Sequence, residues 1–208
     1  MPTTIDRADL PALIARASGL LGDGRRILGL TGPPGAGKST LAAEIVGALA
    51  PACVLVPMDG FHLAQSELDR LGRHGRKGAI DTFDGFGFVA LVRRLRAATE
   101  DVYAPTFRRD LEEPIAGAIH VAANVPVVVL EGNYLLASQP PWSSLRELMD
   151  DVWYLDPDRE ARLARLVRRH EEFGRDAAAA RAWALGSDER NAELIAQTRG
   201  RADVVVVG

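Results

Sequence analysis

Residues 27–40 read ILGLTGPPGAGKST, and this stretch decides the fold. It begins as an apolar, buried-type strand, and residues 32–39 then fit the pattern G-x-x-x-x-G-K-[ST] ahead of a predicted helix. Glycines in this pattern let backbone N–H groups turn inward around the β- and γ-phosphates of a nucleotide. The lysine adds positive charge there, and the hydroxyl can bind magnesium. The sequence therefore predicts a loop that binds a nucleoside triphosphate, in preference to a bland glycine-rich turn.

Lysine usage adds a second candidate to this site. Only two of the 25 basic residues are lysines, Lys38 and Lys77. A compact ammonium group suits a single phosphate oxygen better than the planar fork of arginine does. Lys77 is therefore a candidate contact of phosphate or substrate, with an ordinary solvated lysine as the alternative. The predicted nucleotide contacts of the loop itself are Gly32, Pro33, Pro34, Gly35, Ala36, Gly37, Lys38, Ser39 and Thr40.

The length suits one domain over residues 1–208, with an N-terminal helix within residues 1–24 and a lid at about 158–185. A net charge of −3 gives no electrostatic reason to expect nucleic acid or a membrane as a partner. The single Cys53 excludes an intramolecular disulfide, and we find neither a signal peptide nor an apolar span of about 20 residues. The sequence predicts a soluble, cytoplasmic protein.

Apolar strands alternate with helices along the chain, which predicts an α/β P-loop NTPase fold with a doubly wound, mainly parallel sheet flanked by helices. Ligands of such sheets bind outside the carboxyl ends of the strands. The expected strands are 26–30, 52–59, 102–104, 125–131, 151–155 and 204–207. The expected helices are 10–21, 41–50, 62–71, 86–98, 158–173, 177–185 and 188–198.

Two acids, Asp59 and Glu131, follow predicted strands and can therefore face the γ-phosphate. One could orient or deprotonate an acceptor hydroxyl while the other holds magnesium or a water molecule on the ion. The residues alone leave helix capping open for Asp59 and a solvated strand end open for Glu131.

The predicted helix 158–173 carries Arg162, Arg165 and Arg169 at spacings of three and four, so the three share a face. This pattern predicts a helical arginine lid that closes over the transferring phosphate and excludes water. A solvated arginine face is the alternative.

Residues in three loops are candidates for holding the acceptor. Asp81, Phe83 and Asp84 could shape a polar substrate pocket, with turn and capping chemistry as the alternative. Arg108 and Arg109 beside Phe107 are typical of a substrate clamp, with a surface loop as the alternative. His62 lies nearby without partners at metal-ligand spacing.

The motifs MDGFH at 58–62 and LEGNY at 130–134, together with residues 72–84, resemble those of the P-loop metabolite kinases that include uridine kinase, phosphoribulokinase and the prokaryotic type of pantothenate kinase. The chain looks most like bacterial proteins called "putative fructose transport system kinases". The resemblance implies that Asp59 is the base and that Ser39 and Glu131 serve magnesium. It also implies a lid formed by the 162–169 arginines.

The same resemblance puts Asp188 and Asn191 near the nucleotide or substrate, and we assign His62, Glu131 and Tyr134 to the substrate side. Residues 107–109 read Phe-Arg-Arg where pantothenate kinases have Tyr-Ser-His, and residues 59–62 read Asp-Gly-Phe-His where uridine kinases have Asp-Ser-Phe-Tyr. Neither pantothenate nor uridine is therefore supported as the acceptor.

Other classes fit the sequence less well. A signalling GTPase would need an Asn-Lys-x-Asp motif, which is absent, and an adenylate-kinase-type enzyme would not place an acid on the strand straight after the first helix. An intact set of Lys38, Ser39, Asp59 and Glu131 argues against a degenerate scaffold. A plain NTPase or nucleotide-gated regulatory module remains the alternative.

We therefore predict a kinase that uses ATP and Mg²⁺ to phosphorylate a hydroxyl of a small polar metabolite, such as a sugar or a pantothenate- or nucleoside-like compound. Lys38, Asp59, Arg165 and Arg169 are the expected catalytic residues, and Arg162 is assigned to the nucleotide. A homodimer is left open.

Overall fold

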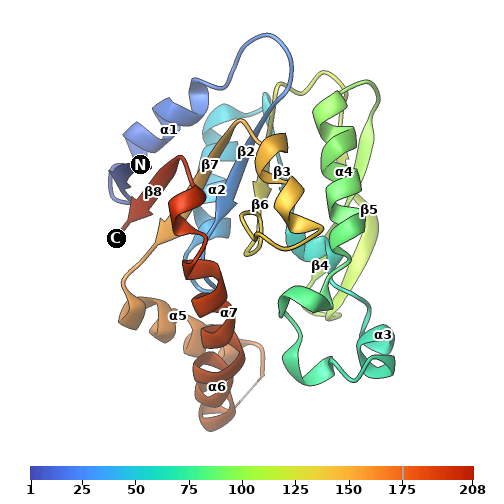
Figure 1. The fold of residues 1–208 in the computed structure, drawn as a ribbon, viewed down its shortest axis with the longest axis vertical. Helices are drawn as coiled ribbons and strands as arrows, with labels where there is room; N and C mark the ends of the chain where they lie inside the picture. Colours follow the sequence, from blue (N-terminus) through green and yellow to red (C-terminus); the bar gives the residue numbers. More distant parts are fainter. Residues whose placement is uncertain (175) are drawn as a thin grey trace.

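The computed structural model describes residues 1–174 and 176–208. Its centre is a six-stranded sheet in the order β1-β8-β7-β2-β6-β3, in which every neighbouring pair is parallel (Figure 1). The prediction of a doubly wound, mainly parallel sheet is confirmed. The strands are β1 (Thr3–Asp6), β2 (Arg26–Thr31), β3 (Cys53–Pro57), β6 (Val127–Glu131), β7 (Asp151–Asp156) and β8 (Val204–Val207).

Helices cover both faces of this sheet (Figure 1). Among the described residues, none of them combines the length and apolarity that crossing a membrane requires. The helices are α1 (Leu10–Ser18), α2 (Lys38–Leu49), α3 (Gln65–Arg70), α4 (Gly85–Ala97), α5 (Arg159–Glu172), α6 (Ala177–Trp183) and α7 (Glu189–Ala196).

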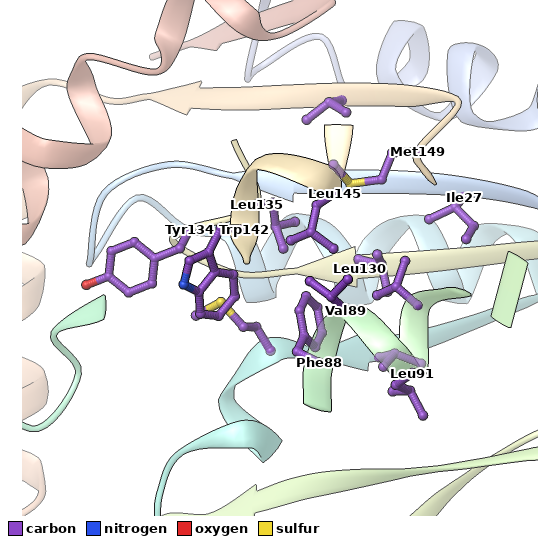
Figure 2. Close-up of a cluster of buried hydrophobic side chains, with 14 of the residues drawn as sticks. Ile27, Phe88, Val89, Leu91, Leu130, Tyr134, Leu135, Trp142, Leu145 and Met149 are labelled. Atoms are coloured by element: carbon purple, nitrogen blue, oxygen red, sulfur yellow. The ribbon is translucent and has the colours of Figure 1, made fainter. Parts of the chain in front are cut away.

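Alternate residues of each central strand enter two different cores. In β6, Val127 and Val129 pack with α1 and α2 on one face, whereas Val128 and Leu130 pack with α4 and the 134–149 segment on the other. Figure 2 shows the second core, where Phe88 and Trp142 lie beside Leu130. Burial on both faces explains why the strands read as continuous apolar runs.

Capping residues set the start of two helices. Asp84 accepts from Gly87 N at 2.8 Å and begins α4, and Asp158 accepts from Ala161 N at 2.9 Å and begins α5. Such side chains satisfy backbone N–H groups that have no partner within the helix. The two side chains thereby stabilise the first turns of α4 and α5.

The structure differs from the sequence prediction at three places. Residues 3–6, ahead of the expected helix at 10–21, form a strand that the sequence did not predict, β1, which lies at the sheet edge and pairs with β8. Residues expected as a loop after 104 continue β4 (Val102–Arg108), which forms an antiparallel hairpin with β5 (Glu113–Val121). The helix expected from 62 begins only at α3, after a 3₁₀ turn at Met58–Phe61.

Candidate active site

The carboxyl ends of β2, β3 and β6 open into a cleft of about 700 Å³. The loop before α2 forms its floor. The β4–β5 hairpin tip and the 62–83 segment line one side, and α5, α6 and α7 line the other (Figure 1). The sequence predicts that the glycine-rich loop, Asp59 and Glu131 lie together at the carboxyl ends of the strands. The structure places them there, in one cleft.

The glycines of the loop are required by their conformation and by their neighbours. Gly35 and Gly37 have φ of 79° and 87°, a region that side chains disfavour. A Cβ atom on Gly35 would lie 2.7 Å from Cγ of Leu166, because α5 packs directly on the loop. Residues 34–40 of the loop line the cleft, whereas Gly32 and Pro33 lie behind it.

Lys38 folds back over the loop. Its Nζ donates to the carbonyl oxygens of Gly32 at 2.9 Å and Pro33 at 3.0 Å. Burial lowers the pKa of Lys38 to about 8, although the nearby carboxylates of Glu131 and Asp59 oppose the shift. The positive charge of the Lys38 ammonium is therefore only partly balanced by its surroundings, and the group is suited to bind a phosphate.

Ser39 and Glu131 lie together at the mouth of the loop, where the Ser39 hydroxyl donates to the Glu131 carboxylate at 3.2 Å. Burial raises the pKa of Glu131, and Lys38 opposes this. Two adjacent oxygen donors fit Mg²⁺, which commonly takes only one or two protein ligands and completes its shell with phosphate and water. In the described part of the chain, no cluster of three or more His, Cys, Asp or Glu could hold a metal ion without such help.

Asp59 lies on the 3₁₀ turn after β3 and lines the cleft. Close packing fixes this turn, since a Cβ atom on Gly60 would lie 2.4 Å from the carbonyl oxygen of Pro105. Arg109, at the hairpin tip, donates to the Asp59 carboxylate at 3.2 Å. The guanidinium of Arg109 also lies 5.8 Å from the ring centre of Phe173, which follows α5.

Aromatic rings form the wall of the cleft on the side predicted to hold the acceptor. His62 lies between Phe83 and Phe107, with ring centres 4.0 and 4.7 Å away. The ammonium of Lys77 lies 5.0 Å from the Phe107 ring centre and 3.3 Å from the Glu112 carboxylate. All five side chains line the cleft, which matches the region predicted to hold the acceptor.

Two predicted substrate residues, Tyr134 and Asp81, and one residue predicted near the nucleotide, Asn191, contact or lie in the 72–84 loop. The hydroxyl of Tyr134 and the amide of Asn191 both donate to the carbonyl oxygen of Gly78, at 2.7 and 3.3 Å. Tyr134 is buried and lies outside the lining of the main cleft, whereas Asn191 contributes to that lining. Asp81 pairs with Arg73 and Arg76 and also lies outside the cleft lining. Tyr134 and Asp81 are therefore placed to hold the loop.

The three arginines that were predicted to share one face of a lid helix lie in two different environments. Arg162 is only 4% exposed, pairs with Glu189 and donates to the carbonyl oxygen of Pro34, so it supports the loop from behind. Arg165 and Arg169 line the cleft. Burial, followed by the charge of Arg109, lowers the pKa of Arg169. The division arises because α5 packs on the loop through the turn that contains Arg162.

Asp188, which the resemblance puts near the site, has a partner at the cleft that the sequence did not predict, His170. His170, at the end of α5, is bonded to Asp188 at 2.7 Å, and Trp183 packs against the His170 ring. Asp188 ends a π-helical turn, Ala184–Asp188, that joins α6 to α7. The helical pattern of residues 177–198 gave no signal for this turn. Only the tertiary arrangement brings His170 to Asp188.

A parallel sheet with a phosphate-binding loop at its centre, acids at neighbouring strand ends and arginines on a covering helix defines a P-loop kinase. Residues 27–207 match the Phosphoribulokinase / Uridine kinase family, and the chain belongs to that family. The resemblance drawn from the sequence motifs is confirmed. The protein is accordingly a phosphotransferase that uses ATP.

Relatives of known sequence are consistent with this family. The chain is 40% identical over 161 residues to the "ATP-dependent kinase-like protein notR'" of Aspergillus versicolor, covering 73% of this chain and 94% of that protein. It is 36% identical over 184 residues to a "putative uridine kinase" of Schizosaccharomyces pombe, covering 82% and 78%.

Solved structures agree in fold. A "putative fructose transport system kinase" from Silicibacter sp. TM1040 superposes with a TM-score of 0.86 at 39% identity, covering 94% of this chain and 98% of that one. YFH7 from Saccharomyces cerevisiae, described as a putative P-loop containing kinase, superposes with a TM-score of 0.81 at 20% identity, covering 96% and 98%, and supports the fold alone.

Proposed function

We propose that this kinase transfers the γ-phosphate of ATP to a hydroxyl group of a small polar metabolite, with Asp59 as the base. One observation carries the proposal. Asp59 and Glu131 line the same cleft as Lys38, the cation of the phosphate-binding loop, and lie close enough to act on its charge, which supports a γ-phosphate held beside both acids.

The loop and α5 supply the donor half. The backbone of residues 34–40, which lines the cleft, and the Lys38 ammonium would hold the phosphates. Ser39 and Glu131 would hold Mg²⁺, which would supply positive charge to offset that of the phosphates. Arg165 and Arg169 reach the same cleft from the covering helix and would stabilise charge on the transferring group.

In the reaction, the acceptor oxygen attacks the γ-phosphorus and the bond from that phosphorus to the β–γ bridging oxygen breaks. Asp59 takes the proton of the acceptor hydroxyl, and ADP leaves with the bridging oxygen. The Arg109 guanidinium, which contacts Asp59, would keep the carboxylate oriented for this step. Lid residues of α5 exclude water, which would otherwise compete with the acceptor.

The acceptor-side wall supports a small polar acceptor. It combines the aromatic faces of Phe83 and Phe107 with polar groups of His62 and Lys77. A sugar agrees with the name of the Silicibacter structure, and with the departures from pantothenate and uridine kinase motifs at residues 59–62 and 107–109.

The test is coupled ADP release by the purified protein with ATP and Mg²⁺, against sugars, polyols, hydroxy acids, pantothenate and nucleosides. We expect at least one acceptor to accelerate ADP release well above the rate with water alone. A slow rate that no acceptor raises would contradict the proposal and favour a nucleotide-gated regulatory NTPase. The Lys38→Ala variant, which should lose all ADP release, controls for contaminating activity.

A further inference from the structure

A buried ion pair contacts the phosphate-binding loop from outside the cleft. Arg162 of α5 is only 4% exposed. Its Nη1 donates to the carbonyl oxygen of Pro34 at 3.3 Å, and its Nη2 donates to the carboxylate of Glu189, the first residue of α7. Neither Arg162 nor Glu189 lines the cleft. A single guanidinium thereby connects the start of α7 to the loop that binds the nucleotide.

Glu189 supplies the negative charge that keeps this guanidinium in place. A buried guanidinium that lacks a carboxylate partner is strongly destabilising, because no water compensates its charge. In the described part of the chain, the salt bridge that Arg162 makes is with Glu189. Burial opposes ionisation of Glu189, but Arg162 and Arg159 outweigh burial and lower the pKa of this acid. The carboxylate is therefore charged at neutral pH.

The hydrogen bond from Arg162 orients one peptide group of the loop. The carbonyl oxygen of Pro34 and the N–H of Gly35 belong to the same trans peptide, so they point in opposite directions. Since the oxygen is held by α5, the N–H points away from α5, and both residues line the cleft. Among the described residues this N–H has no hydrogen-bond acceptor. It can therefore donate to a phosphate, as N–H groups of such loops do.

Glycine makes this orientation depend on an outside contact. Gly35 has a φ of 79°, and glycine adopts positive and negative φ at similar cost. The peptide between Pro34 and Gly35 can therefore rotate without a large local penalty. Such a rotation would turn the N–H toward α5 and direct the partly negative carbonyl oxygen at the phosphates. The hydrogen bond from Arg162 to Pro34 opposes this rotation.

We infer that Glu189 is a positioning residue for nucleotide binding, which acts through Arg162 to keep the Gly35 N–H directed at the phosphates. The inference goes beyond the proposed function, because it concerns the ATP side and holds whatever the acceptor is. The chain also offers a matched control. Arg159 lies 2.7 Å from the Glu189 carboxylate, but its side chain is 64% exposed.

Binding of Mg·ADP, measured by titration calorimetry without any acceptor, tests the inference through a double-mutant cycle. Arg162→Met and Glu189→Ala should each raise the dissociation constant by about tenfold, because the peptide loses the bond that orients it. The double variant should also lose about tenfold and not a hundredfold, since Glu189 acts only through Arg162. Arg159→Ala leaves the buried pair intact and should stay within about twofold of wild type.

Stability is separated from positioning within the same cycle. Glu189→Ala leaves a buried, unpaired guanidinium and should lower the unfolding temperature, whereas the double variant removes both charges and should recover part of that loss. Its affinity for Mg·ADP should not recover. If Glu189→Ala does not fold, Glu189→Gln takes its place, because the amide fills a similar volume, and it should weaken Mg·ADP binding by about threefold or more.

A second readout is the Gly35 amide itself, observed by NMR of isotope-labelled free protein. In the wild type we expect one orientation of the peptide and no exchange at Gly35. In Arg162→Met and in the Glu189 variant, rotation of the peptide should produce exchange on the microsecond-to-millisecond timescale, which relaxation dispersion detects. Gly47, within α2, should show no exchange in any of these proteins.

The inference would be overturned by wild-type affinity for Mg·ADP in the Glu189 variant, by losses that multiply in the double variant, or by a Gly35 amide without exchange in both single variants. An equal loss of affinity in Arg159→Ala would overturn it as well. None of these outcomes depends on an acceptor. A chain that binds Mg·ADP as described but that no acceptor stimulates would leave the inference standing and contradict the proposed function alone.

Discussion

The guanidinium of Arg109 donates to the carboxylate of Asp59 at 3.2 Å, and this contact joins the tip of the β4–β5 hairpin to the turn after β3. The two residues are 50 positions apart in the chain. Because Arg109 also lies over the ring of Phe173 at the end of α5, one side chain connects the proposed base, the hairpin and the lid helix. The acceptor half of the cleft depends on this junction.

Replacing Arg109 with alanine should therefore lower kcat/KM for the acceptor by about tenfold, because the Asp59 carboxylate loses a charge-assisted hydrogen bond. The dissociation constant of ATP should change little. Arg108→Ala is the matched control, since Arg108 pairs with Asp110 and lies outside the cleft lining. Steady-state kinetics of both variants check this prediction. An equal loss of activity in Arg109→Ala and Arg108→Ala would show that the contact between Arg109 and Asp59 has no special role.

ATP binding should take up a proton at alkaline pH. Burial holds the pKa of Lys38 at about 8 in the free protein, below its usual 10.5, so the ammonium is partly neutral above pH 8. A bound triphosphate favours the charged form and raises this pKa again. ATP affinity should consequently fall as pH rises from about 8 toward 10, by at most about tenfold per unit.

Calorimetry in buffers of different ionisation enthalpy measures this uptake directly. We expect almost no proton uptake at pH 6.5, where Lys38 is already charged, and a clear uptake at pH 8.5.

The same pKa shift makes the charged lysine unfavourable for folding. Its cost is fully present below about pH 8 and disappears as pH rises toward 10.5, so Lys38→Met should stabilise the free protein at pH 7. Equal proton uptake by Lys38→Met and the wild type would contradict the assignment.

Gly35→Ala should abolish measurable ATP binding. The position has a φ of 79°, and a methyl group there would lie 2.7 Å from Leu166, so either the loop or α5 must move. Gly47→Ala is the matched control, because Gly47 lies in α2 with no atom within 4 Å of its added Cβ. That control should gain about 0.5–1 kcal/mol in stability. Nucleotide titration and thermal unfolding of both variants measure these effects. Normal ATP binding by Gly35→Ala would contradict the close packing of α5 on the phosphate-binding loop.

Tyr134→Phe removes a hydroxyl whose 2.7 Å hydrogen bond holds the carbonyl oxygen of Gly78. Asn191 still donates to that oxygen, so the loop should loosen without unfolding. We expect a loss of about 1 kcal/mol in stability and a higher acceptor KM at unchanged ATP affinity. A double variant with Asn191→Ala should lose more than the two single variants together. Strict additivity would show that the two donors do not act as a unit.

The sequence predicted those parts of the fold that rest on local pattern. Strands β2, β3, β6, β7 and β8 were recognisable because burial on both faces demands continuous apolar runs. Strand β1 reads TTID and is mostly exposed, so its pairing with β8 leaves no apolar signature. The outer strand of the hairpin, β5, is likewise mostly exposed and carries Pro114 and Gly117. Its existence depends on β4 as a partner.

The site residues divide in the same way, into those predicted from a local motif and those brought together only by tertiary packing. Positions fixed by a motif at a strand end, such as Ser39 and Asp59, line the cleft as expected. Helical spacing put Arg162 on one face with Arg165 and Arg169, but it could not show which part of that face packs against the phosphate-binding loop. Contacts between distant segments, such as His170 with Asp188, depend on how α5 meets α7 and leave no local pattern.

The central claim is that Asp59 acts on the acceptor and not on ATP, and one comparison tests it most directly. Wild-type protein and Asp59→Asn are assayed for ADP release with the best acceptor, and for ATP binding without it, with Asp110→Asn as a control for removing an acid elsewhere near the hairpin tip. We predict that Asp59→Asn lowers kcat by about 10²–10⁴ while the ATP dissociation constant stays within about twofold. Near-normal turnover by Asp59→Asn, or a loss explained entirely by weaker ATP binding, would contradict the account.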